Sequence, residues 1–93
     1  MSDESTVHAQ LTLKNKQGLH ARAAAVFVRA LATLKAEVAV TWQNRVVNGR
    51  SMLDLMTLGA PYGSVIEVQI TGDDADAALA ALSKVIEERF HEE

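Results

Sequence analysis

The chain has 93 residues, no cysteine and a formal net charge of −3, which bounds it to one domain with a modest core. The lack of cysteine excludes disulfides and thiolate metal sites, and histidines at positions 8, 20 and 91 lack metal-ligand spacing. Because no apolar run approaches a membrane span and the polar start lacks signal-peptide regions, we expect a cytoplasmic protein without metal, cofactor or membrane insertion.

Charge is unevenly distributed along the chain. Residues 14–50 hold seven basic residues and one acidic residue, a net +6, whereas the remaining residues sum to −9. The basic segment favours an acidic or phosphorylated protein partner. Nucleic acid is not expected, because the chain is acidic overall and its aromatic residues do not alternate with basic ones. Solvated surface charge alone is the alternative explanation.

The first half of the chain predicts three strands and a helix. After a disordered extension over residues 1–6, alternating apolar and polar residues from Val7 to Lys14 predict a strand. A polar loop follows, and apolar residues at helical spacing then predict a helix from Ala21 to about Leu34. Strands are predicted at residues 38–42 and 45–47, joined by a turn at Gln43 and Asn44.

The second half predicts a short helix, a strand and a long helix. Ser51 starts the short helix, with Asp54 as the other half of a capping box, and Gly59 ends it. A strand at residues 65–70 follows. The segment Gly72-Asp73-Asp74 breaks it and caps a helix whose apolar stripe reaches Phe90, leaving a tail at residues 91–93. The order β-α-β-β-α-β-α predicts one α+β domain over residues 7–90. It is an open-faced β-sandwich with a four-stranded sheet and three helices packed on one face.

The stretch Gly18-Leu19-His20-Ala21-Arg22 carries the candidate chemistry. It places a histidine where a glycine-bearing loop becomes a helix, and free N–H groups and the macrodipole make a helix start an anion site. His20 would attack a phosphoryl group, whose oxygens the N–H groups of Ala21 and Arg22 and the Arg22 guanidinium would hold. An exposed capping histidine without this chemistry is the alternative that the pattern leaves open.

Two spaced segments resemble one family. Gly18 to Arg22, followed by Ala24-Ala25, resembles the active-site signature of HPr. HPr is the histidine-containing phosphocarrier of the bacterial phosphoenolpyruvate-dependent sugar phosphotransferase system. The segment Asn48 to Ala60 resembles the second signature of that family, around its regulatory serine, and the resemblance covers roughly Val7 to Phe90. Many members have proline where this chain has Ala23, and alanine there is expected to keep the helix while letting Arg22 move more.

The resemblance implies a phosphoryl relay for sugar uptake. His20 would accept a phosphoryl group on Nδ1 from phosphorylated enzyme I and donate it to an enzyme IIA domain. Arg22 matches the phosphate-binding arginine, and Ser51 matches the serine that an HPr kinase/phosphorylase modifies, besides serving as a helix N-cap. Partner contacts are expected from Arg29 and from Met52, Leu53 and Met56, which match an exposed docking patch. Core packing of at least one of these three apolar side chains is the alternative.

Two other functions stay open. The chain could belong to a regulatory, nitrogen-related branch of the family, in which phosphorylation controls partner binding. A small α+β module that binds a partner without any phosphohistidine is the third interpretation. No second acid, base or cofactor motif accompanies His20, so we expect a monomeric relay protein with a phosphohistidine intermediate and no independent enzymatic turnover. His8 and His91 lack such a setting and are predicted surface residues.

Overall fold

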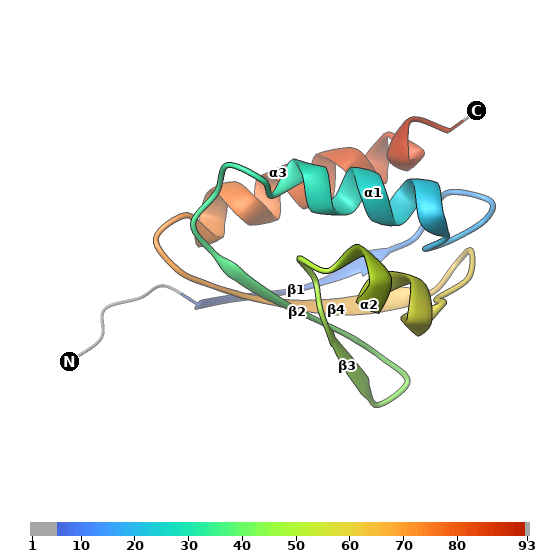
Figure 1. Cartoon of the computed structure of the whole chain (residues 1–93), viewed down its shortest axis with the longest axis horizontal. Helices are drawn as coiled ribbons and strands as arrows, with labels where there is room; N and C mark the ends of the chain where they lie inside the picture. Colours follow the sequence, from blue (N-terminus) through green and yellow to red (C-terminus); the bar gives the residue numbers. More distant parts are fainter. Residues whose placement is uncertain (1–5, 93) are drawn as a thin grey trace.

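The computed structural model describes residues 6–92. The elements run β1 (Thr6–Thr12), α1 (Ala21–Ala30), β2 (Glu37–Trp42), β3 (Arg45–Asn48), α2 (Met52–Leu58), β4 (Val65–Thr71), α3 (Ala75–Glu87) and the 3-10 turn η1 (Arg89–His91). The strands form one antiparallel sheet in the order β1-β4-β2-β3, and the three helices cover one of its faces (Figure 1). The predicted open-faced sandwich is confirmed. The predicted disordered extension falls on residues 1–5, outside the described part, and on Thr6, which already belongs to β1.

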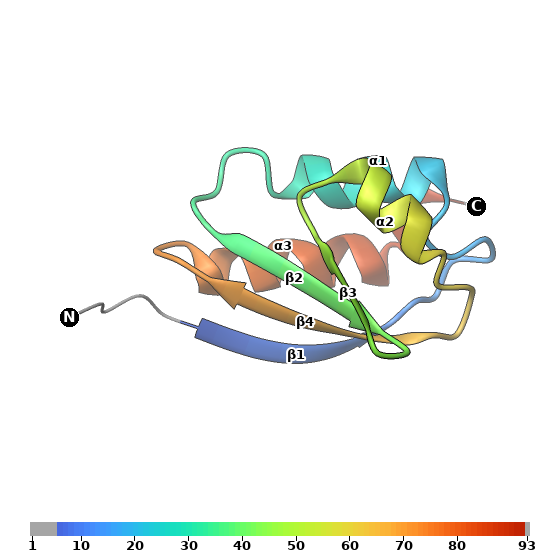
Figure 2. The same cartoon turned by 60° about the horizontal axis from the view of Figure 1, so that its bottom comes forward.

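The alternation of the strands sends apolar side chains toward the helices. In β4 the fully buried residues alternate with exposed ones, and β2 pairs with it so that Val38 faces Ile70 and Val40 faces Val68. The opposite face is left open to solvent, as Figure 2 shows. The largest side chains in the core between the sheet and the helices are those of Phe27 in α1 and Phe90, which are both fully buried. Because the helices cover one face of the sheet, the helices and their loops carry the residues of the candidate site.

Two helices end earlier than their apolar patterns predict. After Ala30 the chain continues in turns, in which Leu31, Ala32 and Leu34 donate to carbonyls three residues back. At the other end, α3 stops at Glu87, and η1 follows with left-handed backbone at Arg89, Phe90 and His91, where φ is 55°, 53° and 63°. The apolar stripe located Phe90 in the core, as observed, but it did not reveal this change of backbone direction.

The predicted caps form only in part. Ser51 Oγ accepts a hydrogen bond from the Asp54 N–H at 3.1 Å, and Gly59 closes α2 with φ of 66°, as expected. However, the Asp54 carboxylate accepts from the Asn48 N–H at 3.2 Å, so the reciprocal half of the capping box is absent. Likewise, the Asp74 carboxylate accepts from the Lys35 N–H at 2.7 Å and does not cap α3. Both carboxylates instead join separate segments.

The loop before α1 is clamped against the end of α2. Leu19 N–H donates to the Ala60 carbonyl at 2.9 Å, and Gly18 has left-handed backbone with φ of 63°. A Cβ added at Gly18 would lie 2.2 Å from the Ala60 carbonyl oxygen, far inside van der Waals contact. Glycine is therefore required here both for backbone conformation and for close approach. This clamp fixes the position from which α1 starts.

We expect Gly18→Ala to destabilise the fold by more than about 3 kcal/mol, because strain and a backbone clash act together. Gly63→Ala is the matched control, since Gly63 also has positive φ, 84°, but an added Cβ would meet nothing within 4 Å. That control should cost only about 1–2 kcal/mol. Urea unfolding measures both values, and equal losses would contradict the close-approach argument.

Candidate functional site

His20 occupies the N-cap position of α1. Its backbone is extended, with φ of −85° and ψ of −175°, and its carbonyl accepts the first helical bond from the Ala24 N–H at 2.9 Å. Its side chain makes no capping bond, so the imidazole is directed elsewhere. Within residues 6–92, the N–H groups of Ala21, Arg22 and Ala23 find no backbone acceptor. The imidazole therefore lies beside free donors at the positive end of a helix dipole.

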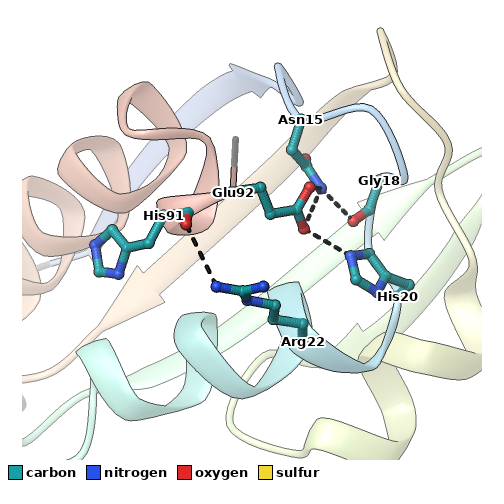
Figure 3. A network of polar contacts seen from close by, with 6 residues as sticks. All are labelled: Asn15, Gly18, His20, Arg22, His91 and Glu92. Atoms are coloured by element: carbon teal, nitrogen blue, oxygen red, sulfur yellow. Dashed lines mark hydrogen bonds and ion pairs between the residues drawn. The ribbon is translucent and has the colours of Figure 1, made fainter.

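The C-terminal turn brings Glu92 onto this imidazole. His20 Nε2 and Glu92 Oε2 lie 2.6 Å apart, and Asn15 Nδ2 donates to the two carboxylate oxygens at 3.4 and 3.3 Å (Figure 3). The same amide nitrogen donates to the Gly18 carbonyl at 2.7 Å, so Asn15 links the loop to the turn. The His20 and Glu92 side chains are 31% and 13% exposed, so water screens this contact only partly.

The contact with Glu92 determines which nitrogen of the His20 ring carries the proton. An ionised carboxylate can only accept hydrogen bonds, so Nε2 of a neutral His20 carries the proton and donates. Nδ1 then keeps its lone pair and is the nucleophilic atom. This arrangement is suited to attack on a phosphorus atom, because the free N–H groups of the first turn of α1 are ready to hold the oxygens of an anionic group.

The backbone that delivers Glu92 is strained. Arg89, Phe90 and His91 are three consecutive left-handed residues other than glycine, and such a conformation costs roughly 1–2 kcal/mol per residue. Two observations account for its persistence: the Phe90 side chain is fully buried in the core, and Glu92 is bound by His20 and Asn15. Burial of a phenylalanine stabilises by about 1.5–3 kcal/mol. The turn is thus held at both of its ends.

Arg22 lies at the same end of α1 but binds the turn. Its exposed guanidinium donates from Nη2 to the His91 carbonyl at 3.5 Å, a long contact that Figure 3 marks. Arg29 is an exposed residue in the last turn of α1. It lines a hollow of about 280 Å³ together with Val85 of α3 and His91. Arg29 therefore lies on the α3 side of α1.

The three apolar residues predicted for docking are all exposed. Met52, Leu53 and Met56 are 39%, 69% and 40% exposed, while Leu55 and Leu58 of the same helix are buried. The alternative that at least one of the three packs inward is wrong. We name Met52, Leu53 and Met56 the α2 patch. Ser51 lies half-buried at the N-terminus of α2, directly before this patch.

Sequence reasoning missed Asn15 and Glu92. Asn15 is the one buried polar residue of the described part, which no sequence pattern indicates, and Glu92 fell within the predicted tail at residues 91–93. That part of the prediction is wrong for Glu92, because its carboxylate packs on His20. His8 and His91 are exposed, as expected.

Neither a metal cluster nor a membrane span is found in the part of the chain that is described. Over residues 6–92, no three side chains of histidine, cysteine, aspartate or glutamate gather closely enough to bind a metal ion. Over the same residues, each helix is too short or too polar to cross a membrane.

Comparisons with known proteins identify the family of this chain. The family profile described as "PTS HPr component phosphorylation site" matches residues 7–88. The chain belongs to the HPr family. It is similar to the phosphocarrier protein HPr of Xylella fastidiosa, with 40% identity over 84 residues that cover 90% of this chain and 94% of the relative.

Two further HPr-type proteins resemble the chain. The phosphocarrier protein NPr of Shewanella violacea is 35% identical over 83 residues, covering 89% of this chain and 91% of NPr. The crystal structure of HPr from Thermoanaerobacter tengcongensis superposes with a TM-score of 0.88 at 38% identity, covering 94% and 98% of the two chains. The fold of this chain is therefore the HPr fold, and its family is that of the phosphocarriers of the phosphotransferase system.

We expect Glu92 to determine the tautomer of His20. In the unaltered protein, ring ¹⁵N shifts above neutral pH should show the proton on Nε2, and Glu92→Ala should lower that preference about fivefold. The reason is that a hydrogen bond to a partly exposed charged group contributes on the order of 1 kcal/mol. Glu88→Ala is the control, because Glu88 pairs with His91 at 2.9 Å and not with His20. Unchanged ring shifts in Glu92→Ala would contradict the assignment.

Proposed function

We propose that this HPr-family protein is a phosphocarrier whose His20 accepts a phosphoryl group from phosphorylated enzyme I and passes it to an enzyme IIA domain in sugar uptake. The observation that carries the proposal is the 2.6 Å contact between His20 Nε2 and Glu92, which leaves Nδ1 free beside the α1 N-terminus. We place this chain in the cytoplasm, together with enzyme I and enzyme IIA. Its membership of the HPr family supports the same conclusion.

Acceptance is a displacement at phosphorus. The Nδ1 lone pair forms the new N–P bond, while the N–P bond of the donor phosphohistidine breaks and its electron pair returns to the donor ring. The His20 ring gains positive charge in this step, and the Glu92 carboxylate at Nε2 stabilises that charge. The proton on Nε2 stays in place throughout. Donation to enzyme IIA is the same step in reverse.

The phosphoryl oxygens need donors as the bond forms. The N–H groups of Ala21 and Arg22 are free in this structure, and a helix N-terminus favours the dianion. The Arg22 guanidinium would exchange its 3.5 Å contact with the His91 carbonyl for a phosphoryl oxygen, a stronger, charge-assisted bond. We assign Arg22 as the phosphate-binding side chain on this basis.

The protein acts as a relay and not as an independent enzyme. His20 has one acceptor partner, Glu92, and this carboxylate is already committed to Nε2. Water activation would need a second general base near the phosphoryl group, and among residues 6–92 no carboxylate other than Glu92 pairs with His20. Each transfer therefore takes place in a complex in which the partner supplies the other half of the active site. The protein works as a monomer between two such complexes.

The α2 patch is the proposed docking surface for both partners. Flexible methionine side chains adapt to different surfaces, which suits a protein that binds enzyme I and enzyme IIA in turn. Arg29 adds a positive charge on the exposed side of α1, where it would meet acidic partner residues.

We extend the proposal to Ser51 as a regulatory site for an HPr kinase/phosphorylase. A phosphate there would add a dianion directly before the α2 patch and would weaken docking by charge repulsion. Ser51 Oγ presently accepts from the Asp54 N–H, so the phosphate would remain at a helix N-terminus, where negative charge is favourable.

A regulatory role in the nitrogen-related branch is the second candidate function. The likeness to the NPr of Shewanella violacea favours it. In that role the same phosphohistidine would form, but its state would control partner binding and would not supply sugar uptake. The two functions differ in the acceptor, so transfer to a sugar-specific enzyme IIA, compared with transfer to its nitrogen-related counterpart, separates them.

The first test is intact-mass spectrometry after incubation with phosphoenolpyruvate and a matched, active enzyme I. We expect one added phosphate that is stable at neutral pH and lost in acid, as a phosphoramidate is. His20→Ala should abolish it, whereas His8→Ala and His91→Ala should keep it. Absence of the added phosphate in the unaltered protein, or its persistence in His20→Ala, would overturn the proposal.

Leu53→Glu tests the docking surface. Placing a charge in the α2 patch should raise the KM for transfer from enzyme I about tenfold or more, because it desolvates a carboxylate in an apolar contact. Val46→Glu is the matched control, since Val46 is 66% exposed and Leu53 69% exposed, but Val46 lies on β3. Equal KM values for the two variants would remove the α2 patch from the interface.

A further inference from the structure

A second hollow lies beside the phosphoacceptor site and is not used by it. It has a volume of about 410 Å³ and is lined by Lys14, Lys16, Tyr62 and Arg89. These residues come from the loop after β1, the loop between α2 and β4, and the turn after α3, so no local sequence pattern brings them together. Three of the four carry positive charge in a chain whose net charge is −3. We name this the basic hollow.

The charges in the basic hollow are only partly compensated. Lys14 Nζ pairs with Glu87 Oε2 at 2.6 Å, while no carboxylate of residues 6–92 lies within ion-pair distance of Lys16 or Arg89. Like charges that converge on one hollow repel one another, and an anion with two or more negative charges relieves that repulsion. The exposed Tyr62 ring adds an apolar face and a hydroxyl group to the same wall.

The backbone around the hollow is fixed. Leu13, next to Lys14, donates to the Ser64 carbonyl at 2.9 Å and accepts from the Gly63 N–H at 3.0 Å, which ties the Tyr62 loop to the end of β1. Arg89 precedes the fully buried Phe90. Only the ends of the side chains must be ordered on binding, so the cost in conformational entropy is limited.

We propose that the basic hollow binds a small phosphorylated anion that carries at least two negative charges, such as a diphosphate group. A volume of about 410 Å³ lies within the range of small-molecule sites. The hollow is lined by no residue of the phosphoacceptor site, so the anion does not need His20 in order to bind. The diphosphate could be free or part of a nucleotide, and Tyr62 provides the surface on which a base would stack.

The location predicts a link between the two sites. Lys14 and Lys16 flank Asn15, and Arg89 lies three residues before Glu92, so two of the three segments that line the hollow also carry the Asn15–Glu92 contact. An anion that draws Lys16 and Arg89 together holds the loop and the turn against each other. Amide signals of Asn15 and Glu92 should therefore shift along with those of the lining residues.

The experiment is a ¹H–¹⁵N titration of the full chain with inorganic pyrophosphate and, separately, with ADP at low salt. We expect saturable shifts at the four lining residues, with about tenfold weaker binding in Lys16→Gln and in Arg89→Gln, since each removes one charge-assisted contact. Lys35→Gln is the control, because this exposed lysine lies between α1 and β2 and does not line the hollow. His20→Ala should keep saturable binding, because His20 does not line the hollow.

Several results would overturn the proposal. These are the absence of saturation by either probe at millimolar concentration, equal losses in Lys16→Gln and Lys35→Gln, and shifts centred on residues 21–23. Slower transfer from enzyme I in Lys16→Gln with unchanged anion binding would also overturn it, in favour of a protein contact. If Arg89→Gln perturbs the whole spectrum, Lys14→Gln replaces it. Tighter binding of ADP that Tyr62→Ala removes identifies a nucleotide, and equal binding of both probes identifies the diphosphate alone.

Discussion

The hydrogen bond between His20 Nε2 and the Glu92 carboxylate is the interaction on which the site depends. It joins residues 72 positions apart, assigns the ring proton to Nε2 and leaves Nδ1 as the free nitrogen. It exists only because the backbone turns left-handed at Arg89, Phe90 and His91. The buried Phe90 side chain stabilises that turn, so a core residue helps to position the Glu92 carboxylate.

The loop before α1 positions the other side of the site. Gly18 allows the loop to approach Ala60 closely, and the clamp fixes the N-terminus of α1 relative to the end of α2. The last turn of α2 and the end of α3 therefore lie at the same end of the molecule as the start of α1 (Figure 1). The imidazole, the free N–H groups and the last turn of α2 consequently share one end of the molecule.

Local patterns in the sequence predicted what local interactions determine. Strand alternation, the Gly59 cap and the Gln43–Asn44 turn depend on neighbours within a few residues, and the structure contains all three. Glu92 and the left-handed turn were not predictable, because arginine, phenylalanine and histidine carry no signature of positive φ and the partner of Glu92 is distant. Asp54 and Asp74 fit local capping rules, yet each binds an N–H group of another segment that the sequence does not reveal.

Ala23 departs from the family pattern, in which many members have proline at this position. Its N–H group, like those of Ala21 and Arg22, has no backbone acceptor among residues 6–92, so a proline there would sacrifice no helical bond. The fully buried Cβ of Ala23 also packs into the core, which fixes the first turn of α1 without a proline ring. The core therefore supplies rigidity that a proline ring would otherwise provide.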